Sequence, residues 1–438
     1  MNDLALFLPC AGGVEEWLAA EVSRIVGAPS AAAAAAEASA TTVPVRAVRG
    51  GVVLRASWRS AMQLNLHSRL AQRVLVQLAH QPYRGEHDLY DIAAGVAWEA
   101  WFTPRQSFKI EVTAQRSPLK SLNFAALRVK DAIADRFRDR SGARPDVDTR
   151  SPDVRIYLHL TAEQATLYID TSGEPLFKRG WREDMGDAPL KETLAAAMIA
   201  ASGWPDDLQR GVPLYDPCCG SGTIAIEAAQ VACGIAPGLR RRFGFERLLP
   251  FERGVWQGLH EQAQASRHAP LAPVFGSDVA FRMVDFAQRN AERAGVSQAL
   301  ELRGGDALQR MPPSAQPGVI LMNPPYGDRI AVAGVAGQRA AGQRAAVQRA
   351  TPQRDAGRAM REDAQGDDGG DFFLQLAAHW KRHYAGWTAW VLTPDIKLPG
   401  RMRLKESRRV PMWNGPIECR IFRFDLVAGT ARARSDAA

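Results

Sequence analysis

The sequence is poor in cysteine and lacks long apolar runs. Its five cysteines are an odd number, and no two of them are spaced as C-x-x-C. This pattern argues against a disulfide framework and a structural zinc site, and it is typical of a reducing compartment. No uncharged apolar stretch approaches the ~20 residues that cross a bilayer, and the N-terminus lacks the basic flank of a signal peptide. We therefore expect a cytoplasmic protein with no membrane span and no metal ion.

Two segments also lack the pattern of folded structure. Residues 28–42 are rich in alanine, and Pro29 with the neighbouring Ser and Thr residues predicts a loop insertion rather than a longer helix. In residues 331–370 Gln-Arg recurs every five residues, a period of neither helix nor strand, and aromatic residues are absent. We expect a disordered surface loop there. Its arginines could also contact RNA, although acidic residues nearly cancel them.

The chain is long and basic. Its 438 residues suggest two or three domains, and a formal net charge of +8 favours a polyanionic partner, although many basic proteins bind no nucleic acid. Residues 1–185 mix strands and helices in an α+β order, in which the strand-like runs 154–160 and 164–171 predict antiparallel pairing. Basic residues surround the strand-like run 108–115 and the following helix. They are either RNA contacts or a solvated helix face.

From about residue 186 strands and helices alternate. This order predicts an α/β fold with an open, mostly parallel sheet and helices on both faces. The chain closes differently, because two strand-like runs flank Asn414-Gly415. Asn-Gly is a strong signal for a hairpin turn, so the last two strands should be antiparallel.

The most informative stretch is LYDPCCGSGTIAIEAA, residues 214–229. An acidic residue, Asp216, ends a strand, a glycine-rich turn follows and a helix begins, which is where a doubly wound sheet binds its ligand. Gly220 and Gly222 allow the backbone to approach that ligand closely. The turn matches neither G-x-x-x-x-G-K-[ST] nor G-x-G-x-x-G, and it has no lysine for phosphates. Asp216 can instead attract a cation such as the ammonium of a methionine moiety.

Two further acidic residues end later strands, Asp278 in FGSD and Asp306 in GGD. Carboxylates at these positions can accept hydrogen bonds from ribose hydroxyls or an adenine amine. Each alone could simply cap the following helix. Three acids at successive strand ends predict a nucleoside site.

The tetrapeptide Asn323-Pro324-Pro325-Tyr326 follows the fourth strand. An exocyclic amine is a poor nucleophile because its lone pair is delocalised into the ring. The Asn323 side-chain oxygen and the Pro324 carbonyl could accept both N–H groups and orient the lone pair towards a methyl donor. Tyr326 could stack on the extruded base. An ordinary proline-rich turn is the alternative, but the upstream D-P-C-C-G-S-G-T favours the amine clamp.

These two motifs resemble those of class I methyltransferases that act on exocyclic nitrogens. The fuller resemblance is to the bacterial 23S rRNA guanine-N2 methyltransferases that carry an N-terminal THUMP domain. It covers nearly the whole chain apart from the two low-complexity segments and the tail. The segments that carry it are SPDVRIYLHL (151–160), KRGWRE (178–183), LKETLAAAMIAASGW (190–204), APGLRRRFGFE (236–246) and NGPIECRIFRFD (414–425).

The resemblance implies a ferredoxin-like region at 1–65, a THUMP RNA-binding domain at 66–175 and a Rossmann-like class I methyltransferase domain at 186–428. It implies S-adenosyl-L-methionine as cofactor and 23S rRNA, or a large-subunit precursor, as partner. The expected cofactor residues are Lys191, Thr193, Asp216, Pro217, Cys218, Gly220, Ser221, Gly222, Thr223, Asp278, Val279, Asp306 and Ala307. Some members of the family continue into a second methyltransferase domain; because this chain stops, we expect no second activity.

The C-terminal stretch 380–423 is strongly basic and could guide RNA towards the clamp. The expected RNA contacts are Lys109, Arg128, Arg179, Arg182, Arg401 and Arg403.

Four alternatives remain open. The strongest alternative is guanine-N2 methylation of tRNA, since THUMP–methyltransferase fusions also act on tRNA. Adenine-N6 methylation of DNA fits the clamp but usually requires a separate target-recognition domain. A protein glutamine methyltransferase would need neither an RNA-capture domain nor a basic excess. A non-catalytic RNA-binding factor would not need intact acids and clamp.

Overall fold

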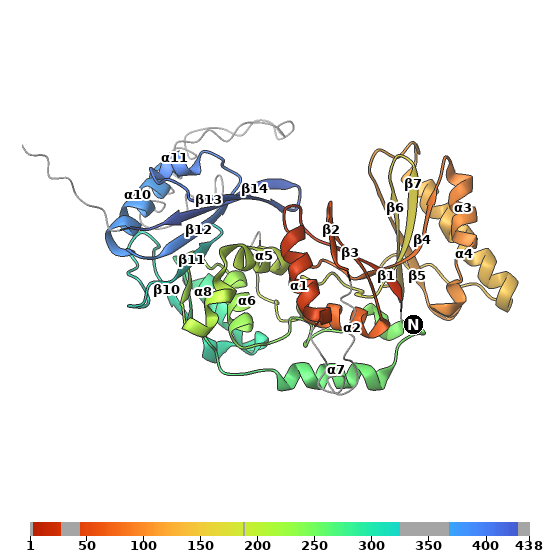
Figure 1. Cartoon of the computed structure of the whole chain (residues 1–438), viewed down its shortest axis with the longest axis horizontal. Helices are drawn as coiled ribbons and strands as arrows, with labels where there is room; N and C mark the ends of the chain where they lie inside the picture. The colour runs from red at the N-terminus through yellow and green to blue at the C-terminus, as the bar shows by residue number, and fades with distance from the viewer. Residues whose placement is uncertain (1–2, 28–43, 187–188, 325–367, 428–438) are drawn as a thin grey trace, which may run out of the picture. The chain divides into compact units, whose positions relative to one another are not determined.

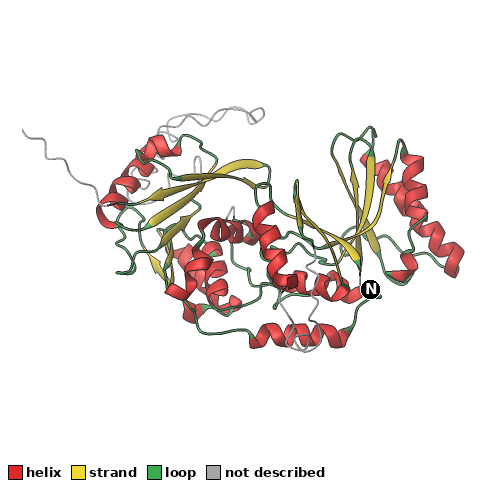
Figure 2. Ribbon diagram, viewed as in Figure 1, coloured by secondary structure: helices red, strands yellow, loops and turns green. Residues whose placement is uncertain are grey.

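A computed structural model describes residues 3–27, 44–186, 189–324 and 368–427. The chain divides into two compact units (Figures 1 and 2). The first unit is Met1–Gly180 with Ile235–Ser266, and the second is Trp181–Gly234 with Arg267–Ala438. No helix within the described residues has the length and apolar character of a membrane span. The same residues contain no group of three His, Cys, Asp or Glu side chains that could hold a metal ion.

The first unit contains one seven-stranded sheet with the order β2-β3-β1-β4-β7-β6-β5. All neighbouring strands are antiparallel except β5 and β6, which are parallel. The predicted antiparallel pair is therefore confirmed as β6 and β7. The strands are β1 (Leu4–Pro9), β2 (Arg46–Val48), β3 (Gly51–Ala56), β4 (Leu75–Pro82), β5 (Phe108–Ala114), β6 (Val154–Leu160) and β7 (Gln164–Asp170).

Two helices of the first unit, α2 and α4, begin after a serine whose hydroxyl caps the helix. Helix α4 begins after Ser121, whose hydroxyl accepts a hydrogen bond from the Phe124 N–H at 3.2 Å. The longer helices are α1 (Glu15–Gly27), α2 (Trp58–His67), α3 (Glu86–Ala94), α4 (Leu122–Ser141) and α7 (Arg253–Ala265). Short 3-10 helices cover Trp98–Ala100 and Gly244–Arg247.

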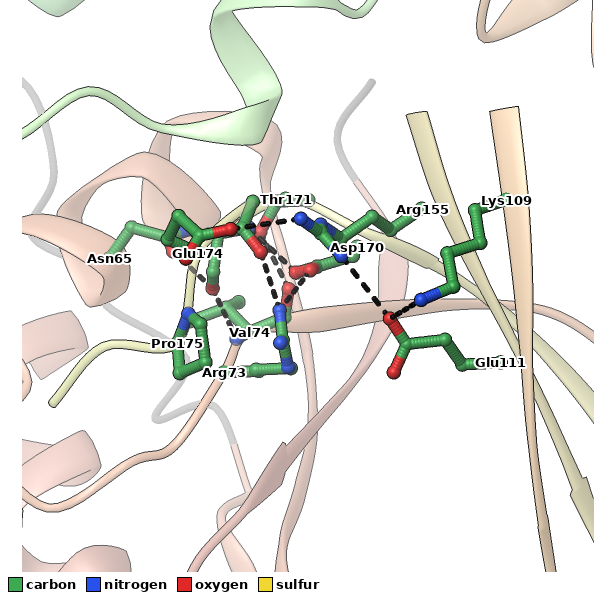
Figure 3. A network of polar contacts seen from close by, with 12 residues as sticks. Asn65, Arg73, Val74, Lys109, Glu111, Arg155, Asp170, Thr171, Glu174 and Pro175 are labelled. Carbon is green, nitrogen blue, oxygen red and sulfur yellow. Dashed lines mark hydrogen bonds and ion pairs between the residues drawn. The ribbon is translucent and has the colours of Figure 1, made fainter. Parts of the chain in front are cut away.

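A network of charged side chains lies beside the sheet of this unit (Figure 3). Arg73 pairs with Asp170, which is almost completely buried, and Arg155 bridges Glu111 at 3.2 Å and Glu174 at 2.8 Å. Burial raises the pKa of Asp170 and the Arg73 charge opposes that shift. The network therefore joins the segment before β4 with β5, β6, β7 and the segment after β7.

The segment 235–266 returns to the first unit from a point between strands of the second. Its Phe245 N–H donates to the Thr171 carbonyl at 2.8 Å, and its Gly238 N–H donates to the Leu66 carbonyl at 2.9 Å. Helix α7, at the end of this segment, packs against α2. The resemblance to known sequences gave no sign that this part of the methyltransferase range packs with the N-terminal residues.

The second unit contains a seven-stranded sheet with the order β10-β9-β8-β11-β12-β14-β13. The first five strands in this order are parallel, and β14 is antiparallel to both β12 and β13. Both predictions for this half are confirmed. The strands are β8 (Leu214–Asp216), β9 (Val274–Asp278), β10 (Leu300–Gly304), β11 (Val319–Met322), β12 (Thr388–Thr393), β13 (Arg408–Asn414) and β14 (Ile417–Asp425).

The hairpin turn differs slightly from the prediction. Asn414 is the last residue of β13 and pairs with Ile417, so the two-residue turn is Gly415-Pro416 instead of Asn414-Gly415. This register leaves Asn414 in the strand, where its side chain has a fixed direction.

Helices cover both faces of the second sheet. Ile320 and Met322 of β11 pack in one core with Phe373, Leu376 and Trp380 of α10. The alternate residues of β11 point to the opposite face, where α5 contacts the strand. The helices are α5 (Glu192–Ser202), α6 (Thr223–Ala232), α8 (Phe281–Ala294), α10 (Asp368–His383) and α11 (Leu398–Met402), with 3-10 helices at Trp204–Arg210 and Ser297–Ala299.

Both predicted loops fall almost entirely outside the described residues. For 28–42 nothing is described. In the second, 331–370, the helix α10 begins at Asp368, so the last three residues of the predicted loop belong to that helix.

Candidate functional site

Three carboxylates meet at one edge of the second sheet. Asp216 ends β8, Asp278 ends β9, and Asp306 follows β10 by two residues. Because these strands are parallel neighbours, their carboxyl ends share an edge. All three aspartates line one cavity of about 400 Å³. The three acids from which we predict a nucleoside site therefore face one common space.

The glycine-rich turn is held against these acids by backbone hydrogen bonds. The Gly220 N–H donates to the Asp278 carboxylate at 2.9 Å, and the Cys218 N–H donates to Asp216 at 3.2 Å. Cys219 N–H donates to the Ser277 carbonyl at 2.9 Å. The ends of β8 and β9 thus hold the turn in its shape through hydrogen bonds within the protein itself.

The two glycines of the turn have different roles. Gly220 has a φ of +52°, and no other atom lies within 4 Å of where its Cβ would be, so its backbone is open to a ligand. Gly222 has a φ of +89°, and a Cβ there would lie 3.0 Å from the Ala287 Cβ of α8. Gly222 therefore allows α6 and α8 to pack closely, and it does not line the cavity.

The electrostatics of the cavity favour a cationic ligand. Burial raises the pKa of Asp216 well above its ordinary value, and the neighbouring Asp278 charge raises it further. Burial also raises the pKa of Asp278, against the hydrogen bonds from Ala280 and Gly220. The pKa values of the Cys218 and Cys219 thiols are raised for the same reason, so neither is a reactive thiolate. A positive group beside Asp216 would relieve the cost of burying its charge.

Asn323 and Pro324 line the same cavity, directly after β11. The sheet order places β11 next to β8, so these two residues neighbour the glycine-rich turn at the same sheet edge. Pro325 and Tyr326, the other half of the predicted clamp, lie outside the described residues.

Most predicted cofactor residues line the cavity, and some do not. Those present are Asp216, Pro217, Cys218, Gly220, Ser221, Thr223, Asp278, Val279, Asp306 and Ala307. Lys191 and Thr193 are absent from its lining: Lys191 is the exposed residue before α5, and Thr193 is buried in the first turn of that helix.

Several lining residues were missed by sequence reasoning. Leu190 lies just before α5, Met283 is in α8, and Phe372 is in α10. Asn414 and Ile417 come from the end of the β13–β14 hairpin. The pair Asn414-Gly415 predicts a turn, but only the order of the strands brings it to this edge.

Two of the predicted RNA contacts have donors that are already bonded within the protein. Arg182 pairs with the buried Glu192 at 2.8 Å and donates to the Thr223 hydroxyl at 2.7 Å, so it braces the start of α6 from inside the second unit. Arg179, in the first unit, is 2% exposed and donates to the carbonyls of Leu176 and Arg69. A positive charge in the sequence does not reveal whether its donors are already bonded within the protein.

The other predicted RNA contacts are at least partly exposed. The ammonium nitrogen of Lys109 lies 3.6 Å from a carboxylate oxygen of Glu111. Arg128 stacks over the exposed ring of Phe124, with 5.4 Å between the guanidinium carbon and the ring centroid. Arg401 and Arg403 are exposed in and just after α11, and Arg401 pairs with Asp395 at 3.2 Å.

A parallel sheet with an antiparallel C-terminal hairpin, a glycine-rich turn and acids at successive strand ends define a class I methyltransferase fold. Comparison with known proteins agrees. The chain matches the RMKL-like methyltransferase domain over residues 179–338, the THUMP domain over 83–170 and the RlmL ferredoxin-like domain over 30–75. The chain therefore contains a ferredoxin-like domain, a THUMP domain and an RMKL-like methyltransferase domain.

Curated relatives are similar over most of this chain. The ribosomal RNA large subunit methyltransferase K/L of Shewanella pealeana is 37% identical over 84% of this chain and 47% of its own length. The protein of the same name from Pseudomonas paraeruginosa is 35% identical over 98% of this chain and 54% of its own length. The chain thus spans about half the length of the curated relatives it matches.

A solved structure has the same fold. SMU.472, a putative methyltransferase complexed with SAH, superposes with a TM-score of 0.77 at 23% identity, covering 97% of this chain and 98% of that chain.

Proposed function

We propose that this protein is an S-adenosyl-L-methionine-dependent methyltransferase that modifies the exocyclic N2 amine of a guanine in 23S rRNA. The observation that carries the proposal is a single cavity lined by the acids after β8, β9 and β10 and by Asn323 and Pro324. Acids and amine acceptors at one sheet edge are what methyl transfer to a planar amine requires. The names of the curated relatives support ribosomal RNA of the large subunit as the substrate.

Each acid has a place in cofactor binding. Asp216 is the buried carboxylate that a methionine ammonium would neutralise. Asp278 and Asp306 offer acceptors to ribose hydroxyls or the adenine amine, and Val279 and Ala307 add apolar surface beside them. Gly220 leaves room for a close approach of the backbone. When bound, S-adenosyl-L-methionine supplies an electrophilic methyl group.

Asn323 and Pro324 orient the amine. The Asn323 side-chain oxygen and the Pro324 carbonyl accept the two N–H groups of the base, so the nitrogen lone pair faces the cofactor side of the cavity. The reaction needs no strong base before transfer, because the proton can leave afterwards. Pro325 would hold the Pro324 carbonyl rigidly, and Tyr326 would stack on the base.

We propose RNA capture by both units, with a ferredoxin-like region at 1–65, a THUMP domain at 66–175 and a catalytic domain at 186–428. Lys109 and Arg128 would contact phosphates from the first unit, and Arg401 and Arg403 from the second. The substrate would be 23S rRNA or a large-subunit precursor, which places the reaction in the cytoplasm.

The test is methyl transfer from labelled S-adenosyl-L-methionine to unmodified 23S rRNA, tRNA and DNA in parallel, with the nucleosides identified by mass spectrometry. We expect N2-methylguanosine in 23S rRNA alone. The same nucleoside in tRNA alone, or N6-methyladenine in DNA, would overturn the proposed substrate. If the cofactor binds but no methyl group is transferred to any of the three, the substrate would be an assembly intermediate of the large subunit, or the protein would have a non-catalytic role.

A variant of the clamp sharpens this test. Asn323→Ala should remove most of the transfer and leave cofactor affinity within about twofold. Gln316→Ala is the matched control, because it also removes an amide near β11 but lies on the exposed surface and does not line the cavity. Undiminished transfer by Asn323→Ala would contradict the clamp.

A further inference from the structure

The β13–β14 hairpin extends beyond the edge of the sheet where the cavity lies. Strand β14 pairs with β12 up to Thr393, the last residue of β12, which faces Arg420. Because the two strands are antiparallel, the preceding residues 417–419 continue past the carboxyl end of β12. Three residues of strand correspond to roughly 10 Å. The free end of the hairpin therefore reaches out over the carboxyl edge of the parallel strands.

Two side chains at that end line the cavity. Asn414 and Ile417 are the last cross-strand pair of the hairpin, and both belong to the lining that includes Asp216 and Asn323. Ile417 is 48% exposed although it is a large apolar residue. Asn414 is half-buried, and within the described residues its side-chain amide makes no hydrogen bond. An apolar surface and an unused amide thus face the same space.

The order of the strands separates these residues from the cofactor acids. Across the carboxyl edge the sequence is β10, β9, β8, β11, β12 and β14, so Asp306, Asp278 and Asp216 lie on one side of Asn323. The hairpin lies on the other side. Strands β11 and β14 are two strand spacings apart, roughly 10 Å. A base whose amine is held by Asn323 would therefore have the hairpin as its wall on the side away from the cofactor.

We propose that Asn414 reads the Watson–Crick edge of the target guanine and that Ile417 packs against the base. This inference rests on the proposed function. When the N2 amine is at Asn323, the next groups along that edge are N1–H, a donor, and O6, an acceptor. A carboxamide complements both, because its oxygen accepts from N1–H and its NH2 donates to O6. Extruded bases are commonly read by hydrogen bonds to this edge and by apolar contacts to the ring.

The experiment replaces the target guanine by 2-aminopurine, which keeps the N2 amine but lacks both N1–H and O6. A 23S rRNA fragment carrying either base at the methylated position is assembled by splint ligation, and kcat/KM is measured for each. For the wild-type protein we expect guanine to be preferred by about 10- to 100-fold, as for a good bidentate contact. Asn414→Ala should remove most of this preference by lowering transfer to guanine while leaving transfer to 2-aminopurine nearly unchanged.

Controls separate a reading role from a structural one. Asn414→Asp keeps the shape of the side chain but loses the donor to O6, so it should lose the preference even if the alanine variant folds poorly. Glu418→Ala removes an exposed neighbour that does not line the cavity and should keep the preference. Ile417→Ala should lower transfer to both bases alike. Cofactor affinity, measured by calorimetry, should be unchanged in all four variants.

The outcomes distinguish this inference from the proposed function. If the wild-type protein makes no N2-methylguanosine in either 23S rRNA or a large-subunit precursor, both are overturned. If it does, and Asn414→Ala keeps the full preference for guanine, the reading role is wrong and the proposed function stands. A loss of cofactor affinity in Asn414→Ala would instead place this residue against the cofactor and would also overturn the inference.

Discussion

The backbone N–H of Gly220 donates a hydrogen bond to the carboxylate of Asp278 across 2.9 Å. This contact joins the turn after β8 to the end of β9, two segments that are far apart in sequence. Asp278 also accepts from the Ala280 N–H at 2.9 Å. One carboxylate therefore fixes the shape of the glycine-rich turn and of the entry to α8, in addition to any contact with a ligand.

Replacing Asp278 should affect both binding and stability. Asp278→Ala leaves the Gly220 and Ala280 N–H groups without their acceptor, and each hydrogen bond to a charged group contributes about 1.5–3 kcal/mol. We expect cofactor affinity to fall at least 10-fold. The urea concentration at the midpoint of unfolding should also be lower than for the wild-type protein. The control is Asp285→Ala, since Asp285 is exposed and forms a surface pair with Arg289. Full cofactor affinity in Asp278→Ala would contradict a role at the cofactor site.

The buried charge of Asp216 should lower the stability of the ligand-free protein. Its carboxylate is 1% exposed, so its charge is costly in the absence of a cation. Asp216→Asn keeps the acceptor for the Cys218 N–H and removes the charge. We expect the melting temperature to rise by about 2–4 °C, the shift for roughly 1 kcal/mol in a domain of this size, while cofactor binding is largely lost. A lower melting temperature together with intact binding would contradict both parts of this prediction.

The same burial predicts a pH dependence. The pKa values of Asp216 and Asp278 are raised in the folded protein above their ordinary value of 3.8. A raised folded-state pKa contributes stability that is fully present below the unfolded value and is lost as pH rises through the folded value. Urea unfolding at a series of pH values should therefore show this loss above pH 3.8, and Asp216→Asn should reduce it. An unchanged pH profile in the variant would exclude Asp216 as its source.

Arg182 should behave as a structural residue. Arg182→Ala removes the partner of the buried Glu192 carboxylate, and breaking a buried pair from one side costs about 3 kcal/mol. We expect a large loss of unfolding free energy, partly recovered in the double variant with Glu192→Gln. After correction for the fraction of folded protein, the salt dependence of RNA binding should be the same as for the wild-type protein. A flatter salt dependence would restore Arg182 as a phosphate contact.

Arg401 and Arg403 should behave in the opposite way. Reversing both charges, Arg401→Glu with Arg403→Glu, should weaken RNA binding and lower the slope of log affinity against log salt by about 0.7–0.9 for each lost phosphate contact. Stability should change little, because both side chains are exposed. Arg210→Glu is the control, an exposed arginine of the same unit outside the basic stretch. Equal effects of the two changes would indicate only a general charge effect.

The sequence predicted those parts of the site that local patterns determine. Each of the three acids ends or follows a strand, and parallel order alone brings strand ends together, so the sequence predicts that Asp216, Asp278 and Asp306 lie at one edge, as they do in the structure. Asn323 is predicted separately, from the N-P-P-Y motif that follows β11, and it lines the same cavity. Lys191 was placed near the cofactor only by resemblance, and the structure puts it at the start of α5, outside the cavity lining.

Other features depend on packing between distant segments. Asn414 enters the cavity because β14 is antiparallel to β12 and overshoots it, a matter of strand order and register that the hairpin motif does not contain. Composition gives no measure of burial, so the sequence does not indicate that Arg179 is almost completely buried. Residues 235–266 likewise belong to the first unit because of contacts such as that between Phe245 and Thr171. No pattern in the neighbouring sequence predicts such a contact.

The return of residues 235–266 to the first unit sets an order of events during synthesis. Domains generally fold as the chain emerges, the N-terminal one first. Here the N-terminal unit lacks α7 and the Phe245 contact until residue 266 has left the ribosome. By then β8, the glycine-rich turn and α6 of the second unit have already been translated. The turn is held by Ser277 and Asp278 of β9, which are translated only after residue 266, so the first unit can be completed before the cofactor turn takes its final shape.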